Sequence, residues 1–128
     1  MTYIRSIDVV LAVAGSRGFN DYDLLTKSIN EISSRKQEVI EIVSGGAKGA
    51  DKLAERYAKE NNILTTIYLP DWKKHGKAAG IIRNKDIIDR ASHVIAFWDG
   101  VSPGTKNSIE RATRAGKVLI VVQYTNKM

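Results

Sequence analysis

Glycine-rich segments that could hold an anion follow three apolar runs of the chain. Residues 15–18 follow the first run, residues 44–51 the second and residues 99–105 the fourth. Glycine lets a ligand approach the backbone, and a helix that starts at such a loop directs unpaired N–H groups and partial positive charge towards it. We predict one anion or nucleotide site at the strand ends. Tight turns between strands and helices also use glycine, so this alternative stays open.

Charged side chains near these loops are further candidates for contacts with the predicted ligand. Arg17 and Arg83 each offer a planar fork that fits phosphate oxygens, or lie solvated at the surface. Asp51 lies in the first turn of a predicted helix, and three roles are open for it. It recognises a ribose hydroxyl, it orients a catalytic water, or its charge only interacts favourably with the positive end of the helix. Asp99 is a ribose ligand or a cap. The catalytic residues stay unknown: Asp51 is the candidate that these patterns give, and the family resemblance given below adds Arg83 and Asp99. No metal or cofactor is expected. The predicted ligand-binding residues are Gly15, Ser16, Arg17, Ser44, Gly45, Gly46, Ala47, Gly49, Asp51, Arg83, Asn84, Asp99, Ser102, Gly104 and Thr105.

The two tryptophans have different expected roles. Trp72 lies in a basic segment with three lysines, at residues 71–77, and is the better candidate for stacking on a base. That segment is able to grip nucleic acid by charge and stacking, or is simply solvated. Trp98 ends an apolar run, so core packing is its expected role.

Apolar runs and helical spacings alternate along the chain. The runs cover residues 8–14, 39–43, 63–69, 93–98 and 117–124, and each ends near Gly, Pro or Asp. Continuous runs of this length indicate buried parallel strands. Four segments with apolar residues at spacings of three and four lie between them, and residues 69–76 form the one long irregular connection. The pattern predicts a single α/β domain over residues 1–128, with a mostly parallel five-stranded sheet, helices on both faces and a Rossmann-like fold.

Composition narrows the class of function. With no cysteine and two histidines in 128 residues, the chain has no disulfides, thiolate metal sites or cysteine nucleophiles. The longest apolar runs are far shorter than a membrane span, and the N-terminal residues hold no signal-peptide run, so we expect a cytoplasmic protein without a membrane partner. The net charge of +6 favours an anionic partner.

Four ordered motifs resemble the YspA/YpsA-related branch of the SLOG superfamily, which also groups the LOG phosphoribohydrolases with the DprA/Smf proteins. The motifs lie at residues 13–17, 44–51, 79–84 and 99–105, and the resemblance extends from about residue 8 to residue 122. It implies a Rossmann-like fold and a nucleotide or nucleotide-derived ligand at the strand ends. A homo-oligomer is expected by the same analogy.

LOG enzymes cleave the N-glycosidic bond of nucleoside 5′-monophosphates, using a helical arginine and a glutamate three residues after a loop threonine. Arg83 is similar in position to that arginine and Thr105 to that threonine. The glutamate position falls on Ser108, and Glu110 lies roughly 200° further round the helix. The resemblance thus implies complete binding machinery without the LOG-type carboxylate, for which Asp51 or Asp99 is the candidate replacement.

Three functions are compatible with these residues. The first is a binding module that senses, carries or sequesters a nucleotide-derived molecule. The alternative is a nucleoside 5′-monophosphate N-glycosidase. The third is single-stranded DNA binding, by analogy with DprA and from the net charge, and it ranks last because the charges lie in both halves of the chain without an evident stripe.

Overall fold

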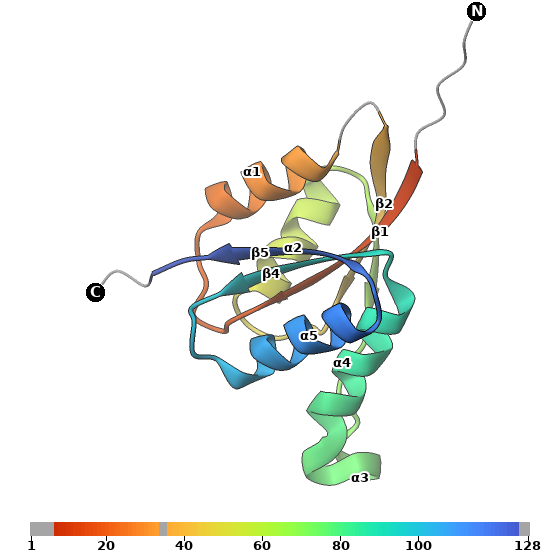
Figure 1. The fold of residues 1–128 in the computed structure, drawn as a ribbon, viewed down its shortest axis with the longest axis vertical. Coiled ribbons are helices and arrows are strands. Elements are labelled where there is room, and N and C mark those ends of the chain that lie inside the picture. Colours follow the sequence, from red (N-terminus) through yellow and green to blue (C-terminus); the bar gives the residue numbers. More distant parts are fainter. Residues whose placement is uncertain (1–6, 34–35, 126–128) are drawn as a thin grey trace, which may run out of the picture.

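Five parallel strands form one sheet in the computed structural model, which describes residues 7–33 and 36–125 (Figure 1). The sheet order is β3-β2-β1-β4-β5, and every neighbouring pair is parallel. The predicted five-stranded parallel sheet and Rossmann-like α/β class are confirmed. The strands are β1 (Ile7–Gly15), β2 (Gln37–Ser44), β3 (Leu64–Ile67), β4 (His93–Trp98) and β5 (Val118–Gln123).

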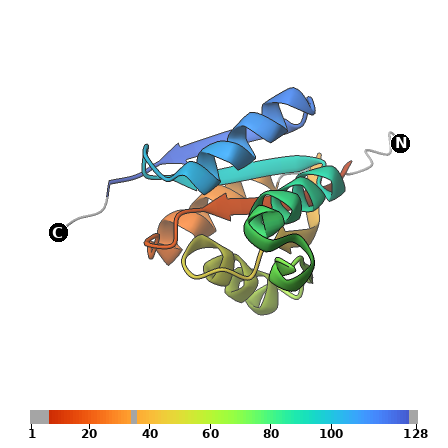
Figure 2. The ribbon, with the colours of Figure 1, turned by 90° about the horizontal axis from the view of Figure 1, so that it is seen from below.

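Helices cover both faces of the sheet, as Figures 1 and 2 show from two directions. The first pair is α1 (Tyr22–Ile32) with α2 (Ala50–Glu60), and the second is α4 (Ala79–Arg90) with α5 (Pro103–Arg114). Successive residues of a strand point to opposite faces. Leu11 of β1 therefore packs in the cluster that contains Ile29 of α1, whereas its neighbour Ala12 packs with Ile88 of α4. Burial on both sides explains why the central strands β1 and β4 read as continuous apolar runs, whereas the edge strands β3 and β5 are partly exposed.

The expectation of an irregular connection over residues 69–76 is wrong in one respect. A one-turn helix, α3 (Trp72–His75), and a 3₁₀ turn, η1 (Gly76–Ala78), lie in this region before α4 begins. Asp71 caps α3, because its Oδ1 accepts a hydrogen bond from the Lys74 N–H at 3.1 Å. A four-residue helix is too short to produce an apolar periodicity in the sequence.

The chain reverses its direction of travel across the sheet between β1 and β4. From β1 the chain builds outwards through β2 to β3, and it then returns to place β4 against the other side of β1. The carboxyl end of β1 lies beside that of β4, where Gly15 is in register with Phe97. Ligands of open α/β sheets bind in the crevice at such a switch point. None of the described helices is long and apolar enough to cross a membrane.

An ion pair between a buried carboxylate and a half-exposed arginine joins α4 to the sheet. Glu41 of β2 is 3% exposed and accepts hydrogen bonds from the Arg90 guanidinium, at 2.6 Å to Oε1 and 3.0 Å to Oε2, and from the Thr66 hydroxyl at 2.9 Å. The hydrogen bonds from Arg90 lower the pKa of Glu41, against the opposing effect of burial, and Thr66 contributes in the same direction. The carboxylate therefore stabilises the fold when it is ionised.

Arg90→Ala is expected to lower the melting temperature at pH 7 by about 2–5 °C, because Arg90 is half exposed and water partly replaces it. A lowered pKa contributes stability above the ordinary pKa of the group, and this contribution is lost as the pH falls below it. The difference between the two proteins should thus shrink below ~pH 4. Thermal melts of both proteins at pH 7 and pH 3.5 measure this, and an equal difference at both values would contradict the assignment.

Candidate functional site

A cavity of about 470 Å³ lies at the switch point between β1 and β4. Its walls come from the loop after β1, the start of α2, the middle of α4, and the loop from β4 into α5. Side chains and backbone of all three predicted glycine-rich segments reach it, together with Arg83 and Asn84 of α4. The segments that the sequence places on one sheet edge therefore converge on one cavity, which is large enough for a small ligand.

Asp51 is the buried carboxylate of this cavity. It is 7% exposed and lies in the first turn of α2, and its Oδ2 accepts a hydrogen bond from the Ala47 N–H at 3.1 Å. Burial raises the pKa of Asp51 to about 6, although the N–H groups of Ala47 and Gly45 and the charge of Arg83 oppose the rise. Asp51 therefore changes its charge close to neutral pH, as a proton-transferring group or a pH-sensitive ligand contact does.

Arg83 reaches from α4 to the loop after β2. Its Nη1 donates to the Gly45 carbonyl at 2.6 Å, and its Nε donates to the Asn84 side chain at 3.2 Å. A Cβ on Gly45 would lie 2.5 Å from Nη1 and 2.9 Å from Cζ, so a larger residue would displace the guanidinium from this position. Gly45 thus makes room for Arg83, which spans two walls of the cavity and carries positive charge into it.

Gly49 holds two of the loops together. Its φ of 83° and ψ of −128° are accessible to glycine but strained for other residues, and a Cβ there would lie 2.3 Å from the Ser16 carbonyl oxygen. The loop after β1 therefore packs directly on the backbone that starts α2. Gly15 makes a similar close approach, because a Cβ on it would lie 2.3 Å from the Cβ of Ala50.

Asp99 shapes the loop that leads into α5. Its Oδ1 accepts from the N–H groups of Val101 and Ser102 at 2.9 and 2.8 Å, and its Oδ2 accepts from the Ser102 hydroxyl at 2.6 Å. The Ser102 hydroxyl, followed by the N–H groups of Ser102 and Val101, lowers the pKa of Asp99 to about 2. Asp99 stays ionised near neutral pH and most of its accepting capacity is used within the loop, which fits a positioning role better than proton transfer.

The N-termini of α2 and α5 both open at the cavity. Gly49 precedes α2 and has no side chain to cap it, and the Ser102 side chain makes no capping bond to α5. The first N–H groups of a helix have no partner within it, and the helix dipole adds partial positive charge there. Ala47, Asp51, Gly104 and Thr105 bring these two ends to the cavity wall. Two helix ends and two arginines make the site suitable for an anion.

Ser16 contributes a hydroxyl to the cavity wall. It is 5% exposed, and its Oγ has no hydrogen-bond partner at bonding distance among the described residues. It lies near enough to Asp99 to be the weakest of the groups that lower the pKa of that residue. A buried hydroxyl without a bonded partner costs free energy, so this Oγ is a locally unfavourable feature of the loop that lines the cavity.

Eleven of the fifteen predicted ligand-binding residues line the cavity, and Ser44, Gly45, Gly46 and Gly49 do not. Ser44 is fully buried, and its hydroxyl donates to Glu55 at 3.0 Å and accepts from the Gly46 N–H at 3.1 Å. A Cβ on Gly46 would meet the side chain of Leu69 at 2.7 Å. These four residues support the walls of the cavity. The residues that line it and were not predicted are Val13, Ala14, Gly18, Ile87, Ile88, Pro103 and Ser108.

The sequence contains a pattern from which two of these additional residues could have been predicted. Ile87 follows Arg83 by four residues and so shares its helix face. Ser108 is buried in the cavity wall at the position where LOG enzymes have their glutamate. Glu110 is exposed and lies outside the cavity lining, as its angular position on α5 predicts. Asp51 is therefore the one buried carboxylate among the described residues that line the cavity.

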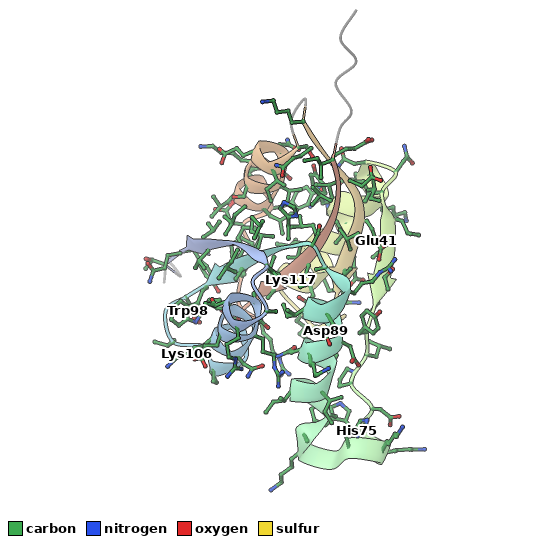
Figure 3. All side chains as sticks on the ribbon, turned by 45° about the vertical axis from the view of Figure 1, so that its right-hand side comes forward. Glu41, His75, Asp89, Trp98, Lys106 and Lys117 are labelled. Carbon is green, nitrogen blue, oxygen red and sulfur yellow. The ribbon has the colours of Figure 1, made fainter. Side chains whose placement is uncertain are left out.

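The tryptophans lie outside the cavity lining. Trp98 is partly buried at the end of β4, beside the start of α5 where Figure 3 labels Lys106, and its indole N–H donates to the Ser102 carbonyl at 3.1 Å. It supports the loop that Asp99 shapes. Trp72 is 57% exposed on α3.

Comparisons with known proteins agree with the sequence motifs. Residues 9–75 match the family described as YspA, cpYpsA-related SLOG family. The matched segment includes the first two glycine-rich loops and ends before Arg83. The chain is also 32% identical over 121 residues to the Gene 61 protein of Mycobacterium phage D29, with 90% of this chain and 95% of that protein covered. No solved structure gives a significant match.

Proposed function

This chain belongs to the YspA, cpYpsA-related SLOG family, and from that premise we propose that it binds a nucleotide or nucleotide-derived phosphorylated ligand in the cavity between β1 and β4. The observation that carries the proposal is the meeting of two uncapped helix N-termini, Arg17 and Arg83 at one cavity. Backbone N–H groups and guanidinium forks are the groups that proteins use to bind phosphate. The protein acts in this proposal as a sensor, carrier or sequestering module.

Each part of the cavity has a matching part of a nucleotide. Gly104 and Thr105, at the start of α5, offer N–H groups to a phosphate. Asp51 offers a carboxylate to a ribose hydroxyl, and Ser16 offers an unpaired hydroxyl to either group. Ile87 and Ile88 provide an apolar wall suited to a sugar or base face.

The test is a thermal-shift series with nucleoside mono-, di- and triphosphates and with inorganic phosphate. A ligand at about 100 times its Kd stabilises the folded state by about 2.7 kcal/mol, which raises the melting temperature by several degrees. Mass spectrometry of the mixture after incubation should detect the ligand with its mass unchanged. If no nucleotide raises the melting temperature above the value with inorganic phosphate, the proposal fails.

Arg83→Ala is expected to weaken binding of the most stabilising nucleotide about tenfold or more, since a hydrogen bond to a charged group contributes about 1.5–3 kcal/mol. The variant also frees the Gly45 carbonyl and loosens one wall of the cavity. Arg114→Ala is the matched control, because Arg114 is an exposed arginine of α5 outside the cavity. Isothermal titration measures both, and equal weakening in the two variants would show that only net charge matters.

A second candidate function rests on Asp51. A buried carboxylate with a pKa of about 6, facing a cavity that also contains Arg83, is suited to general acid–base work in N-glycosidic hydrolysis of a nucleoside 5′-monophosphate. Chromatography would then detect free base from a monophosphate, and Asp51→Asn would abolish its release. Unchanged release in both Asp51→Asn and Arg83→Ala would exclude the assigned roles.

A further inference from the structure

A basic arm extends from the body of the protein beyond the cavity. The arm comprises residues 71–78, which form α3 and η1, and Figures 1 and 3 show it projecting at the start of α4, with His75 labelled on it. It carries Lys73, Lys74 and Lys77, all exposed. Among the described residues, none of these three lysines forms an ion pair with a carboxylate. The ion pairs there are formed by Lys52, Arg56, Lys85 and Arg90.

The carboxylate of the arm is directed to its own backbone. Asp71 accepts from the Lys74 N–H, so it fixes the helical turn that displays the lysines. The three lysines are neighbours in the sequence, and the fold places them on one projecting turn. Such a turn is a local site of positive potential for a polyanion.

An exposed aromatic ring lies among the lysines. Trp72 is 57% exposed, and its ring edge leans on the helix at Gly80, where a Cβ would lie 3.9 Å from the Cη2 atom. Gly80 precedes Arg83, which lines the cavity, by three residues, or about 4.5 Å along the axis of α4. Trp72 therefore presents a ring to solvent about one helical turn from the cavity wall.

We propose that the arm binds single-stranded nucleic acid, with Trp72 stacking on an unpaired base and Lys73, Lys74 and Lys77 contacting the phosphates. Proteins that bind single strands combine these two elements, an aromatic platform and cations along the backbone. The arm is too short to act as a recognition helix in the major groove of a duplex. A lipid surface is bound by helices with a broad apolar face. The arm itself offers one large apolar side chain among lysines, although the exposed Leu69 and Ile81 flank it, and vesicles with anionic lipid are therefore part of the test.

The test is fluorescence anisotropy with a labelled oligothymidylate of about 12 nucleotides, at about 50 and about 200 mM salt. Trp72→Ala is expected to weaken binding about 5-fold to 150-fold, the fold-change that corresponds to ~1–3 kcal/mol per stacked base. Trp72→Phe is expected to retain most of the affinity. Lys73→Ala combined with Lys74→Ala should reduce the salt slope by about 1.4, because each phosphate contact on a single strand contributes about 0.7.

The matched control combines Lys27→Ala with Lys59→Ala, which removes the same charge from exposed positions on α1 and α2. Unchanged affinity and slope in this control support the arm as the site. Equal losses in both double variants would show attraction by net charge and overturn the proposal. It is also overturned if the oligonucleotide does not bind while vesicles with anionic lipid do, or if Trp72→Ala leaves the affinity unchanged.

Discussion

Asp51→Asn is expected to raise the melting temperature at pH 7.5 by about 10 °C. A carboxyl whose pKa is raised from 3.8 to about 6 in the folded protein makes ionisation unfavourable there by about 3 kcal/mol, and asparagine does not ionise. The side chain keeps an oxygen that accepts from the Ala47 N–H, so the start of α2 is retained. The gain is large because Asp51 is 7% exposed and pairs with no cation at bonding distance among the described residues.

The expected pH dependence of stability is opposite to the usual one for an acidic residue, whose ionised form stabilises the folded state. Because the folded state holds the proton of Asp51 more tightly than the unfolded state, wild-type stability falls as the pH rises from about 4 to about 6. The variant lacks this fall, so the two melting temperatures should agree near pH 4, separate between about pH 4 and pH 6, and differ by a constant amount above that range. Melting temperatures at half-unit intervals measure the difference, and a variant less stable than wild type at pH 7.5 would contradict the assignment.

Asp99→Asn provides a control of opposite sign. Its hydrogen bonds from Ser102 and Val101 lower the pKa of Asp99 to about 2, so the ionised group stabilises the loop above the ordinary pKa of 3.8 and loses that effect as the pH falls towards 2. The Asp99 variant should therefore melt below wild type at pH 7.5. Opposite signs in the two variants would agree with the proposed roles, in which Asp51 contacts a ligand and Asp99 holds its own loop.

The binding experiment completes this argument. If Asp51 accepts a hydrogen bond from a ligand hydroxyl, the more stable Asp51→Asn protein should show a smaller ligand-induced shift, because asparagine offers one accepting oxygen in place of two. A variant that is more stable and binds the nucleotide equally well would remove Asp51 from the ligand contacts. Stability and binding thus give separate readouts of the same residue.

The central strands could be predicted from sequence because both of their faces are buried. Residues 93–98 show this most clearly, since five of the six residues of β4 are buried and its predicted and observed bounds coincide. The site at the strand ends followed from the alternation of strands and helices. The sequence does not give the order of the strands, so the switch point between β1 and β4 is visible only in the structure. The α3 turn escaped prediction because Asp71 specifies it through a single cap, without apolar periodicity.

The roles of the glycines could not be predicted, because their partners are distant in the sequence. Gly45 makes room for Arg83, 38 residues away, and Gly49 lies on the carbonyl of Ser16 from the preceding loop. The sequence shows glycine at these positions but not which neighbour requires it. The ion pair between Glu41 and Arg90 could not be predicted for the same reason. The two residues are 49 positions apart, and neither belongs to a distinctive sequence pattern.

Gly49→Ala is expected to destabilise the protein by about 3 kcal/mol or more and to abolish nucleotide binding. Alanine adds about 1–3 kcal/mol of backbone strain at a φ of 83° and a ψ of −128°. Its Cβ also lies 2.3 Å from the Ser16 carbonyl oxygen and 2.7 Å from that of Arg17, so the loop after β1 has to move away from α2. That movement separates Ser16 and Arg17 from Asp51, and the walls of the cavity no longer face one ligand.

Gly116→Ala separates strain from steric clash. Gly116 has a φ of 69°, and a Cβ there meets nothing within 4 Å, so the substitution carries backbone strain alone at a position outside the cavity lining. It should cost about 1 kcal/mol and leave nucleotide affinity unchanged. Urea denaturation and titration of both variants decide the matter: if Gly49→Ala costs no more than Gly116→Ala and binds normally, the packing of the first loop on the start of α2 does not form the site. Both substitutions add one methyl group to a glycine with a positive φ, and they differ in what that methyl group contacts. A larger cost and lost binding in Gly49→Ala would therefore show that the cavity depends on this backbone contact.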